Sequence, residues 1–227
     1  MTASLSPTAR TRLARNRERG ATERAALHDL LEAGLIAHLG VLFDGVPRVL
    51  PTAYAHDVDG PDDEGTLYIH GSVASKSLTD APTQTVCVTI TLVDGLVLAR
   101  SGFHHSMNYR SAVILGQPRQ VDDASERDHA LDLIVDHLAP GRSKTLRAHT
   151  RKELVATTVL ALPLREASVK SRTGGVNDEP FDVEAGDIWA GVVPMAMAYG
   201  APERNDDCSA ALDVPDHVRA LTDASPL

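Results

Sequence analysis

The sequence predicts a mostly β fold, a small β-barrel with a few helices outside it. Two turn dipeptides, Asp44-Gly45 and Asp94-Gly95, each lie between apolar runs typical of strands, which is a strong local signal for a β-hairpin. The chain has no Gly-x-Gly-x-x-Gly sequence after a strand, so a Rossmann dinucleotide site is not indicated. Hairpins that follow one another with few helices favour an antiparallel closed sheet over alternating βαβ units.

The first half of the chain is expected to form one helix and then a series of strands. Thr22 is the expected cap of an amphipathic helix over residues 24–31 that ends at Gly34. Pro47 and Pro51 place parts of the second strand at a sheet edge or a bulge, because proline cannot donate to a strand ladder. The expected strands cover residues 35–43, 48–56, 67–70, 85–93 and 96–100.

The second half combines long strands with one clear helix. The apolar spacing over residues 125–138 predicts an amphipathic helix, with Ser125 and Asp128 as a capping box and Pro140-Gly141 as its stop. The expected strands cover residues 109–121, 153–168 and 187–193.

The composition is that of an acidic, soluble protein. The 227 residues are 43% hydrophobic, enough for one sizeable core, and their net charge is −9. This charge argues against nucleic acids and anionic membranes as partners. Cys87 and Cys208 lie far apart and indicate no disulfide framework. We find neither a membrane-span pattern nor a signal-peptide core, so a cytoplasmic location is expected.

Three regions differ in composition. Residues 1–20 are a polar, arginine-rich N-terminal arm, residues 21–200 carry the expected strands and helices, and residues 201–227 are a polar C-terminal tail that we expect to be loosely held. The arm lacks the interleaved aromatic residues of a nucleic-acid-binding segment. It is therefore expected to lie in solvent or along a partner.

The stretch from Leu67 to Leu78 is the best candidate for an anion site. A short apolar strand leads into a turn, and a helix is expected to start near Ser75 and Lys76. A helix N-terminus presents free N–H groups and a partial positive charge, and hydroxyl groups and a lysine add donors there. Two interpretations stay open from these residues alone, a phosphate site or a capped helix whose lysine is solvated.

Other common chemistries find little support in the sequence. His104 and His105 are adjacent, so on an extended strand their side chains point to opposite faces, and no cysteine or carboxylate cluster with ligand spacing lies nearby. No metal site is therefore expected. The chain also lacks the Gly-x-Ser-x-Gly sequence of α/β-hydrolases. His70 stays open as a ligand, a general acid or a core histidine, and no catalytic residue is assigned.

Eight short blocks match one known family in their order and spacing. Three of them are Leu67–Ser72, Asp94–Ser101 and His104–Ser111. The others cover residues 34–40, 44–47, 86–89, 167–174 and 188–194. With these blocks the chain resembles the split-barrel proteins related to pyridoxamine 5′-phosphate oxidase. It is most similar to a branch of flavin-nucleotide-binding proteins related to the nitroimidazole-resistance reductases.

The resemblance implies a split β-barrel over residues 21–200 that forms a homodimer and holds FMN in a groove between the two subunits. Ser75 and Lys76 match the pair that grips the FMN phosphate, and Arg110 is expected to reach the flavin from the second subunit. The residues implied at the cofactor are Arg48, Val49, Leu50, Thr52, His70, Gly71, Ser75, Lys76, Asn108, Tyr109, Arg110, Ser111, Lys170 and Trp189.

Two departures from the family pattern bear on activity. The oxidase proper carries an Arg-x-His pair after its tryptophan to bind the substrate phosphate, whereas residues 192–197 here carry no charge. A substrate phosphate buried without cations would be strongly destabilised, so pyridoxamine-phosphate oxidation is not supported. The insertion over residues 94–106 is expected to form a hairpin lid over the flavin.

The resemblance therefore implies an FMN-dependent oxidoreductase of unknown small-molecule substrate, with NAD(P)H as a candidate electron donor. Three alternatives stay open. The same barrel could serve a deazaflavin, it could bind or degrade heme, which histidine-rich loops would suit, or it could be a non-catalytic flavin sensor or store.

Overall fold

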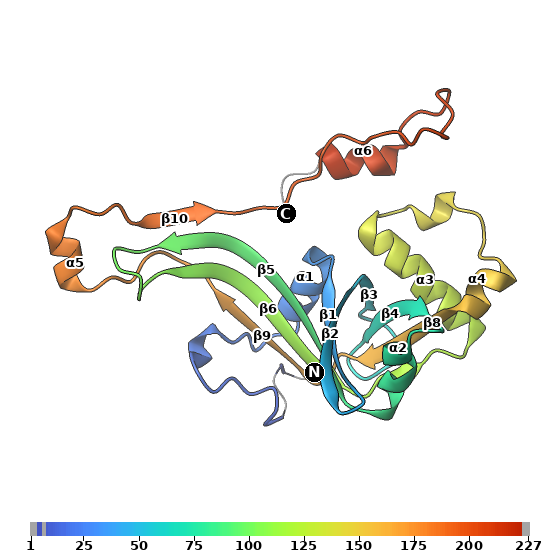
Figure 1. The fold of residues 1–227 in the computed structure, drawn as a ribbon, viewed down its shortest axis with the longest axis horizontal. Helices are drawn as coiled ribbons and strands as arrows, with labels where there is room; N and C mark the ends of the chain where they lie inside the picture. The colour runs from blue at the N-terminus through green and yellow to red at the C-terminus, as the bar shows by residue number, and fades with distance from the viewer. Residues whose placement is uncertain (1–3, 6–7, 224–227) are drawn as a thin grey trace.

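The computed structural model describes residues 4–5 and 8–223, so parts of the N-terminal arm and the end of the C-terminal tail lie outside the described residues. Within these residues the fold is mostly β, with two antiparallel sheets and short helices around them (Figure 1). The predicted fold class is confirmed. Neither strand order closes on itself, so the sheets form a split arrangement rather than one continuous barrel.

The first sheet, sheet A, has the strand order β2-β1-β5-β6-β9, and β10 pairs with β5. The second, sheet B, has the order β3-β4-β8-β7. The strands of sheet A are β1 (Ala37–Phe43), β2 (Val46–Thr52), β5 (Val86–Leu98), β6 (Ser106–Gly116), β9 (Ala167–Arg172) and β10 (Gly191–Pro194). Those of sheet B are β3 (Tyr54–Asp57), β4 (Thr66–Ser72), β7 (Arg119–Gln120) and β8 (Thr157–Pro163).

The helices are short and lie around the sheets (Figure 1). The α-helices are α1 (Ala25–Ala33), α2 (Lys76–Asp80), α3 (Ala124–Leu138), α4 (Arg151–Ala156), α5 (Pro180–Ala185) and α6 (Asp216–Asp223). Single 3₁₀ turns cover Arg17–Arg19, Ala81–Thr83 and Ser143–Thr145. Among the described residues we find no helix whose length and apolar character would let it cross a bilayer.

One apolar core joins α1 to both sheets. Leu27, Leu30 and Leu31 are buried on one face of α1, as the spacing of apolar residues predicts. Ile90 of sheet A and Leu162 of sheet B belong to the same core. Burying one such side chain stabilises the fold by roughly 1.5–3 kcal/mol, so this core holds the two sheets together.

A second, smaller core lies between α3 and sheet B. Ala130, Leu131 and Ile134 are buried on α3, which confirms the predicted apolar face of that helix. Tyr68 of β4 and Val159 of β8 pack into the same cluster. This core fixes α3 over the sheet B face that also carries His70.

The first predicted hairpin is confirmed. Asp44 and Gly45 have φ values of 51° and 77°, as a two-residue turn with both central residues left-handed requires. The turn joins β1 to β2, whose residues pair from Phe43↔Val46 to Ala37↔Thr52. Strand β2 is an edge strand, which accommodates its two prolines.

The second predicted hairpin turn is wrong. Asp94 and Gly95 lie inside β5, where the register with β6 shifts between Val93 and Gly95, so they form a β-bulge. Pairing continues to Val97↔Ser106, and the real turn follows it. Residues 94–107 therefore form the outer part of one long hairpin, the β5–β6 extension, which reaches away from the core in Figure 1.

Three predicted long strands are each divided in the structure. Residues 48–56 form β2 and then β3, which belong to different sheets, and residues 109–121 form β6 and then β7 in the same way. Residues 153–168 begin as α4, form β8 and enter sheet A as β9. The chain changes sheets at Pro118 and just after Pro163, where proline interrupts the ladder.

Two predicted helix caps are also wrong. The residue at the start of α1 is Arg24 rather than Thr22. Helix α3 is capped by Asp123, whose side chain accepts a hydrogen bond from the Glu126 backbone N–H at 2.8 Å, in place of Ser125.

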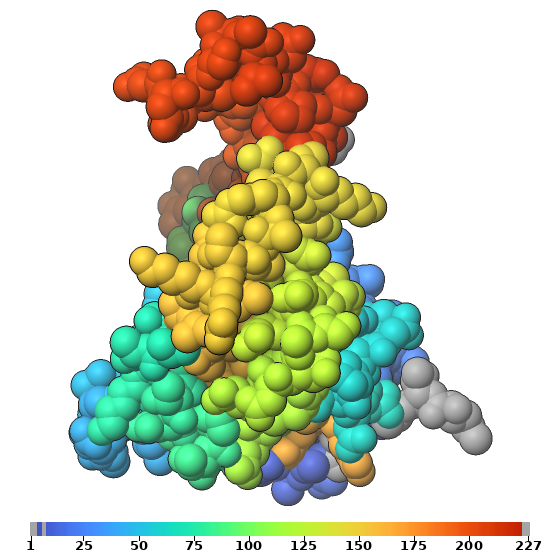
Figure 2. Space-filling view, turned by 90° about the vertical axis from the view of Figure 1, so that its right-hand side faces the viewer, coloured from blue at the N-terminus to red at the C-terminus, as the bar shows by residue number. Residues whose placement is uncertain are grey.

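The described parts of the N-terminal arm and of the C-terminal tail contact the body of the protein. Arg10 of the arm pairs with Glu166, and just after the arm the Ala21 N–H donates to the Val169 carbonyl at 3.1 Å. The last predicted strand is shorter than expected, because only Gly191–Pro194 pairs with β5 and Trp189 precedes it. The polar tail contains α6, and Figure 2 shows the red C-terminal segment resting on the yellow region that follows α3.

Candidate functional site

The structure distributes the predicted cofactor residues over four regions of one chain. The first region is the tip of the β1–β2 hairpin, beside the start of α2. The Arg48 guanidinium lies 3.8 Å from the centroid of the Phe43 ring, and Lys76 Nζ lies 4.8 Å from the same centroid. The fold thus brings Arg48 and Lys76, two predicted cofactor contacts that are far apart in the sequence, to one aromatic ring. We call Arg48 and Lys76 the Phe43 cation pair.

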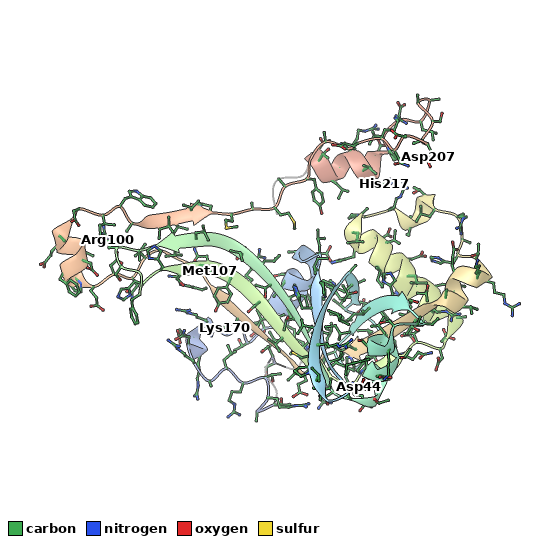
Figure 3. All side chains as sticks on the ribbon, in the orientation of Figure 1. Asp44, Arg100, Met107, Lys170, Asp207 and His217 are labelled. Atoms are coloured by element: carbon green, nitrogen blue, oxygen red, sulfur yellow. The ribbon has the colours of Figure 1, made fainter. Side chains whose placement is uncertain are left out.

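Among the described residues, the lysine of this pair forms one weak ion pair. Lys76 Nζ lies 3.4 Å from Asp44 Oδ1, and the two side chains are 58% and 71% exposed. Asp44 is labelled at this end of the molecule in Figure 3. Exposed ion pairs contribute about 0–1 kcal/mol, so an incoming anion can replace Asp44. Ser75 precedes α2 as its N-cap, and its hydroxyl makes no capping hydrogen bond.

A groove of about 260 Å³ runs beside the Phe43 cation pair. Arg48 and Val49 of β2 and Cys87 of β5 line it. Val49 is 65% exposed, although apolar residues on a strand usually face a core. Leu50 and Thr52 continue the same strand and are half-buried. This surface is open and apolar, with cations at one end.

The second region lies on β6 and β9, at the base of the β5–β6 extension. Arg110 donates to Asp94, from its Nε at 3.1 Å and from its Nη2 at 2.8 Å, and this pairing raises the pKa of Arg110. The two side chains line a cavity of about 260 Å³ together with Met195 and Met197. Arg110 therefore lines a cavity, and the Asp94 carboxylate balances its positive charge.

The neighbours of Arg110 are largely bonded to one another. The Ser111 hydroxyl donates to the Lys170 carbonyl at 3.4 Å, and Lys170 Nζ donates to the Arg15 carbonyl at 3.3 Å. The side-chain amide of Asn108 donates to the Gly174 carbonyl at 3.1 Å. Tyr109 is half-buried beside them. Figure 3 labels Lys170 on the side of the N-terminal arm, so its ammonium group holds that arm to β9.

The third region consists of Trp189, near the outer end of the β5–β6 extension. Its side chain is 68% exposed, and its ring lies close to Gly191, where a Cβ atom would come within 2.8 Å of it. In Figure 1 the start of β10 and helix α2 lie at opposite ends of the molecule. Within one chain Trp189 and Lys76 therefore do not form one site.

The fourth region contains His70, on β4. The imidazole lines a cavity of about 310 Å³ between β4, α3 and α4, here called the His70 cavity. Its Nδ1 atom is buried and has no hydrogen-bond partner among the described residues, and burial lowers the pKa of the imidazole. Gly71 instead packs against α2, because a Cβ there would lie 2.4 Å from Leu78 Cδ1.

The walls of the His70 cavity are mostly apolar. Leu131, Ile134 and Val135 of α3 line it on one side and Leu154 of α4 on another. His149, from the loop before α4, is the second histidine in its lining. A buried imidazole nitrogen without a hydrogen-bond partner is costly unless a ligand or a water pairs with it.

Sequence reasoning missed another group of side chains. Glu32 of α1, His56 of β3 and His137 of α3 each place one potential ligand atom within 4.8 Å of the other two. The residues are far apart in the chain and show no ligand spacing, so only the fold brings them together. His104 and His105, which the sequence does not favour as a metal site, are not part of such a group among the described residues: His104 faces Glu179, and His105 Nδ1 lies 2.8 Å from the Ser101 carbonyl.

With this geometry in hand, the chain can be compared with known proteins. The family model of pyridoxamine 5′-phosphate oxidase matches residues 23–171. The chain belongs to this family. The family predicted from the eight sequence blocks is thereby confirmed. A search of curated proteins gave no significant match.

Three solved structures illustrate the relationship. The flavocytochrome Anf3 from Azotobacter vinelandii is 32% identical, with 96% of this chain and 98% of that chain covered and a TM-score of 0.86. The FAD and heme binding protein from Mycobacterium smegmatis is 36% identical, with 90% and 97% covered and a TM-score of 0.82. A proposed 5-nitroimidazole antibiotic resistance protein from Bacteroides thetaiotaomicron, at 22% identity, 67% and 86% coverage and a TM-score of 0.53, shares the fold.

Proposed function

We propose that this protein is a flavoprotein oxidoreductase of the flavocytochrome type, which binds a flavin and a heme in one chain. Two relatives support the pair of cofactors, since one is a flavocytochrome and the other binds FAD and heme, and both match this chain over nearly its whole length. The observation that carries the proposal is the His70 cavity with its unpaired imidazole nitrogen.

The side chains that line the His70 cavity have the chemistry of a heme site. Heme iron needs an axial ligand, most commonly an imidazole, and the porphyrin needs apolar walls. His70 provides a nitrogen without a competing hydrogen bond, and Leu131, Ile134 and Leu154 provide the walls. Because burial lowers its pKa, the His70 imidazole is neutral near pH 7 and its lone pair is free to bind a metal. His149, in the same lining, would be a second candidate ligand.

The residues around Phe43 fit a flavin nucleotide. Arg48 and Lys76 supply two positive charges for a phosphate group, and the groove lined by Val49 and Cys87 supplies an apolar surface beside them. FMN is the flavin that the sequence blocks predict. The relative that binds FAD makes FAD the other candidate for this groove.

We further propose a homodimer that completes the flavin site. Within one chain, Arg110 lies at the base of the β5–β6 extension and Trp189 lies just before β10, whose start is at the opposite end of the molecule from α2 (Figure 1). The extension and the β1–β2 hairpin expose apolar side chains, with Phe103 at 91% and Val49 at 65% exposure. Contact between these surfaces of two protomers would bury them and bring the predicted flavin contacts together.

The chemistry follows from the proposed cofactors. A flavin exchanges a hydride or single electrons, and a heme exchanges single electrons, so together they would link a two-electron donor such as NAD(P)H to a one-electron acceptor. The chain itself orients the groups and limits the access of water. Pyridoxamine-phosphate oxidation is not proposed, because residues 192–197 provide no cation for a substrate phosphate.

The cofactor content of the purified full-length protein tests this proposal. After incubation with heme, FMN and FAD and removal of unbound cofactor, we expect about one heme and one flavin per chain. Chromatography of the extracted flavin distinguishes FMN from FAD. A protein that retains neither heme nor flavin would contradict the proposal. A protein that retains a flavin and no heme would remove the flavocytochrome assignment.

A further inference from the structure

Outside the proposed cofactor sites, one cluster of side chains has the composition of a metal centre. Glu32, His56 and His137, here called the Glu32–His56–His137 cluster, come from three different elements, α1, β3 and α3. One potential ligand atom from each lies within 4.8 Å of the other two. The cluster contains no residue of the His70 cavity and none of the predicted flavin contacts.

The fold ties the three elements together at one backbone group. His137 Nε2 lies 2.7 Å from the Gly34 carbonyl oxygen, just after α1. The Tyr54 hydroxyl lies 2.8 Å from the same carbonyl and 2.7 Å from that of Leu31, which holds β3 to the end of α1. Gly34 has no space for a side chain, because a Cβ would lie 2.6 Å from Ile90 Cγ2. The positions of His56 and His137 are therefore fixed by the framework.

The hydrogen-bond pattern suits metal ligands. With the proton of His137 on Nε2, where it is donated to the Gly34 carbonyl, Nδ1 keeps its lone pair for a ligand, and such a second hydrogen bond is typical of ligating histidines. His56 Nδ1 is buried and has no hydrogen-bond partner among the described residues. A buried, unpaired imidazole nitrogen is destabilising, and a bound metal ion or its water would pair with it.

The cluster borders a cavity through which an ion can enter. Glu32 and His137 line a cavity of about 470 Å³ between α1, the end of α3 and α6. Tyr199 and His217 line the same cavity from the C-terminal tail, and His217 Nε2 is also buried without a partner in the described part of the chain. Figure 3 labels His217 on α6, above the end of α3. Coordination positions beyond the three side chains are therefore open to water or a small ligand.

We propose that Glu32, His56 and His137 bind a divalent transition-metal ion of the Zn²⁺ class. Two imidazole nitrogens and one carboxylate oxygen with an open position are the ligand set of many zinc sites, and imidazole selects such ions over Mg²⁺ and Ca²⁺. This site goes beyond the proposed flavin and heme function and does not depend on it.

Calorimetric titration of the full-length protein with ZnCl₂, after removal of bound metals with a chelator, tests the proposal. We expect about one Zn²⁺ per chain in the unmodified protein. Replacing a ligand should weaken binding at least about tenfold. Glu32→Gln is the main variant, because Glu32 is exposed and its replacement does not disturb the core. His137→Gln is the second, and the Glu32→Gln result stands even if His137→Gln is unstable.

Two control variants make the test specific. His129→Ala removes an exposed imidazole from the same helix α3, and His105→Ala removes an exposed imidazole from the β5–β6 extension. Both should bind Zn²⁺ like the unmodified protein. The proposal is overturned by no Zn²⁺ binding, by unchanged binding in Glu32→Gln, or by a loss of binding in either control as large as in Glu32→Gln.

Discussion

At the scale of single residues, the chemistry of this protein depends on side chains whose partners are missing or weak. Lys76 has an exposed aspartate as its partner, and the ring nitrogens of His56 and His70 are buried without one in the described part of the chain. In most folded proteins such groups are paired. Here each one lies at a surface groove or beside a cavity, so we interpret them as ligand contacts.

Lys76→Ala tests the flavin contact at this scale. Loss of a charge-assisted hydrogen bond to a phosphate costs about 1.5–3 kcal/mol, which corresponds to roughly a tenfold to hundredfold weaker flavin affinity. Quenching of flavin fluorescence during titration of the apoprotein measures this affinity. Lys144→Ala is the matched control, since Lys144 is an exposed lysine that is neither part of the Phe43 cation pair nor a predicted flavin contact. Equal affinities of Lys76→Ala and the unmodified protein would refute the phosphate assignment.

At the scale of elements, helix α1, strand β3 and helix α3 meet at Gly34. The Gly34 carbonyl lies within hydrogen-bond distance of both Tyr54 and His137. The sequence predicts Gly34 correctly as the end of α1, because glycine is common at that position. It does not reveal that two other elements pack against this residue, since their contacts join segments far apart in the chain.

Gly34→Ala should destabilise the protein by about 1–3 kcal/mol, because a Cβ would lie 2.6 Å from Ile90 Cγ2 and 2.8 Å from the Tyr54 hydroxyl oxygen. The φ of −85° at Gly34 is also allowed for alanine, so the expected loss of stability comes from the steric clash and not from backbone strain. Urea unfolding measures it. Gly102→Ala is the matched control, because a Cβ there meets no atom within 4 Å. If both variants unfold at the same urea concentration, the proposed junction at Gly34 is wrong.

At the scale of the whole molecule, the sequence predicts local features better than the path of the chain. The Asp44-Gly45 turn and the apolar face of α3 follow from short-range patterns and are confirmed. The Asp94-Gly95 pair carries the same turn signal, but the pairing of β6 along the whole of β5 makes it a bulge. The changes of sheet after β2, β6 and β8 depend on long-range packing, which local patterns do not contain.

The candidate site shows the same limit. The resemblance predicts Arg48 and Lys76 because they match positions at which the family contacts its cofactor, and the fold brings both residues to the same ring. The resemblance implies that Arg110 reaches the flavin from the second subunit, but it does not imply the separation of Trp189 from Lys76 within one chain. The sequence leaves the heme alternative open and assigns it no ligand, because the environment of His70 depends on α3 and α4, which only the fold places beside it.

The proposed homodimer gives a prediction at this scale. Light scattering coupled to size-exclusion chromatography should give twice the 24.2 kDa mass of one chain. The reason is the exposed apolar surface of the β1–β2 hairpin and the β5–β6 extension, which a second protomer would bury. A monomeric protein that still binds a full complement of flavin would show that one chain forms the site alone.

The most direct measurement for the proposed function is the visible absorption spectrum of His70→Ala after incubation with heme and flavin. The unmodified protein and the His129→Ala control should show both the Soret band of bound heme and the flavin bands. His70→Ala should retain its flavin and lose at least about nine-tenths of its heme, since the axial ligand is gone. A His70→Ala protein with an unchanged Soret band and heme content would contradict our assignment of the His70 cavity.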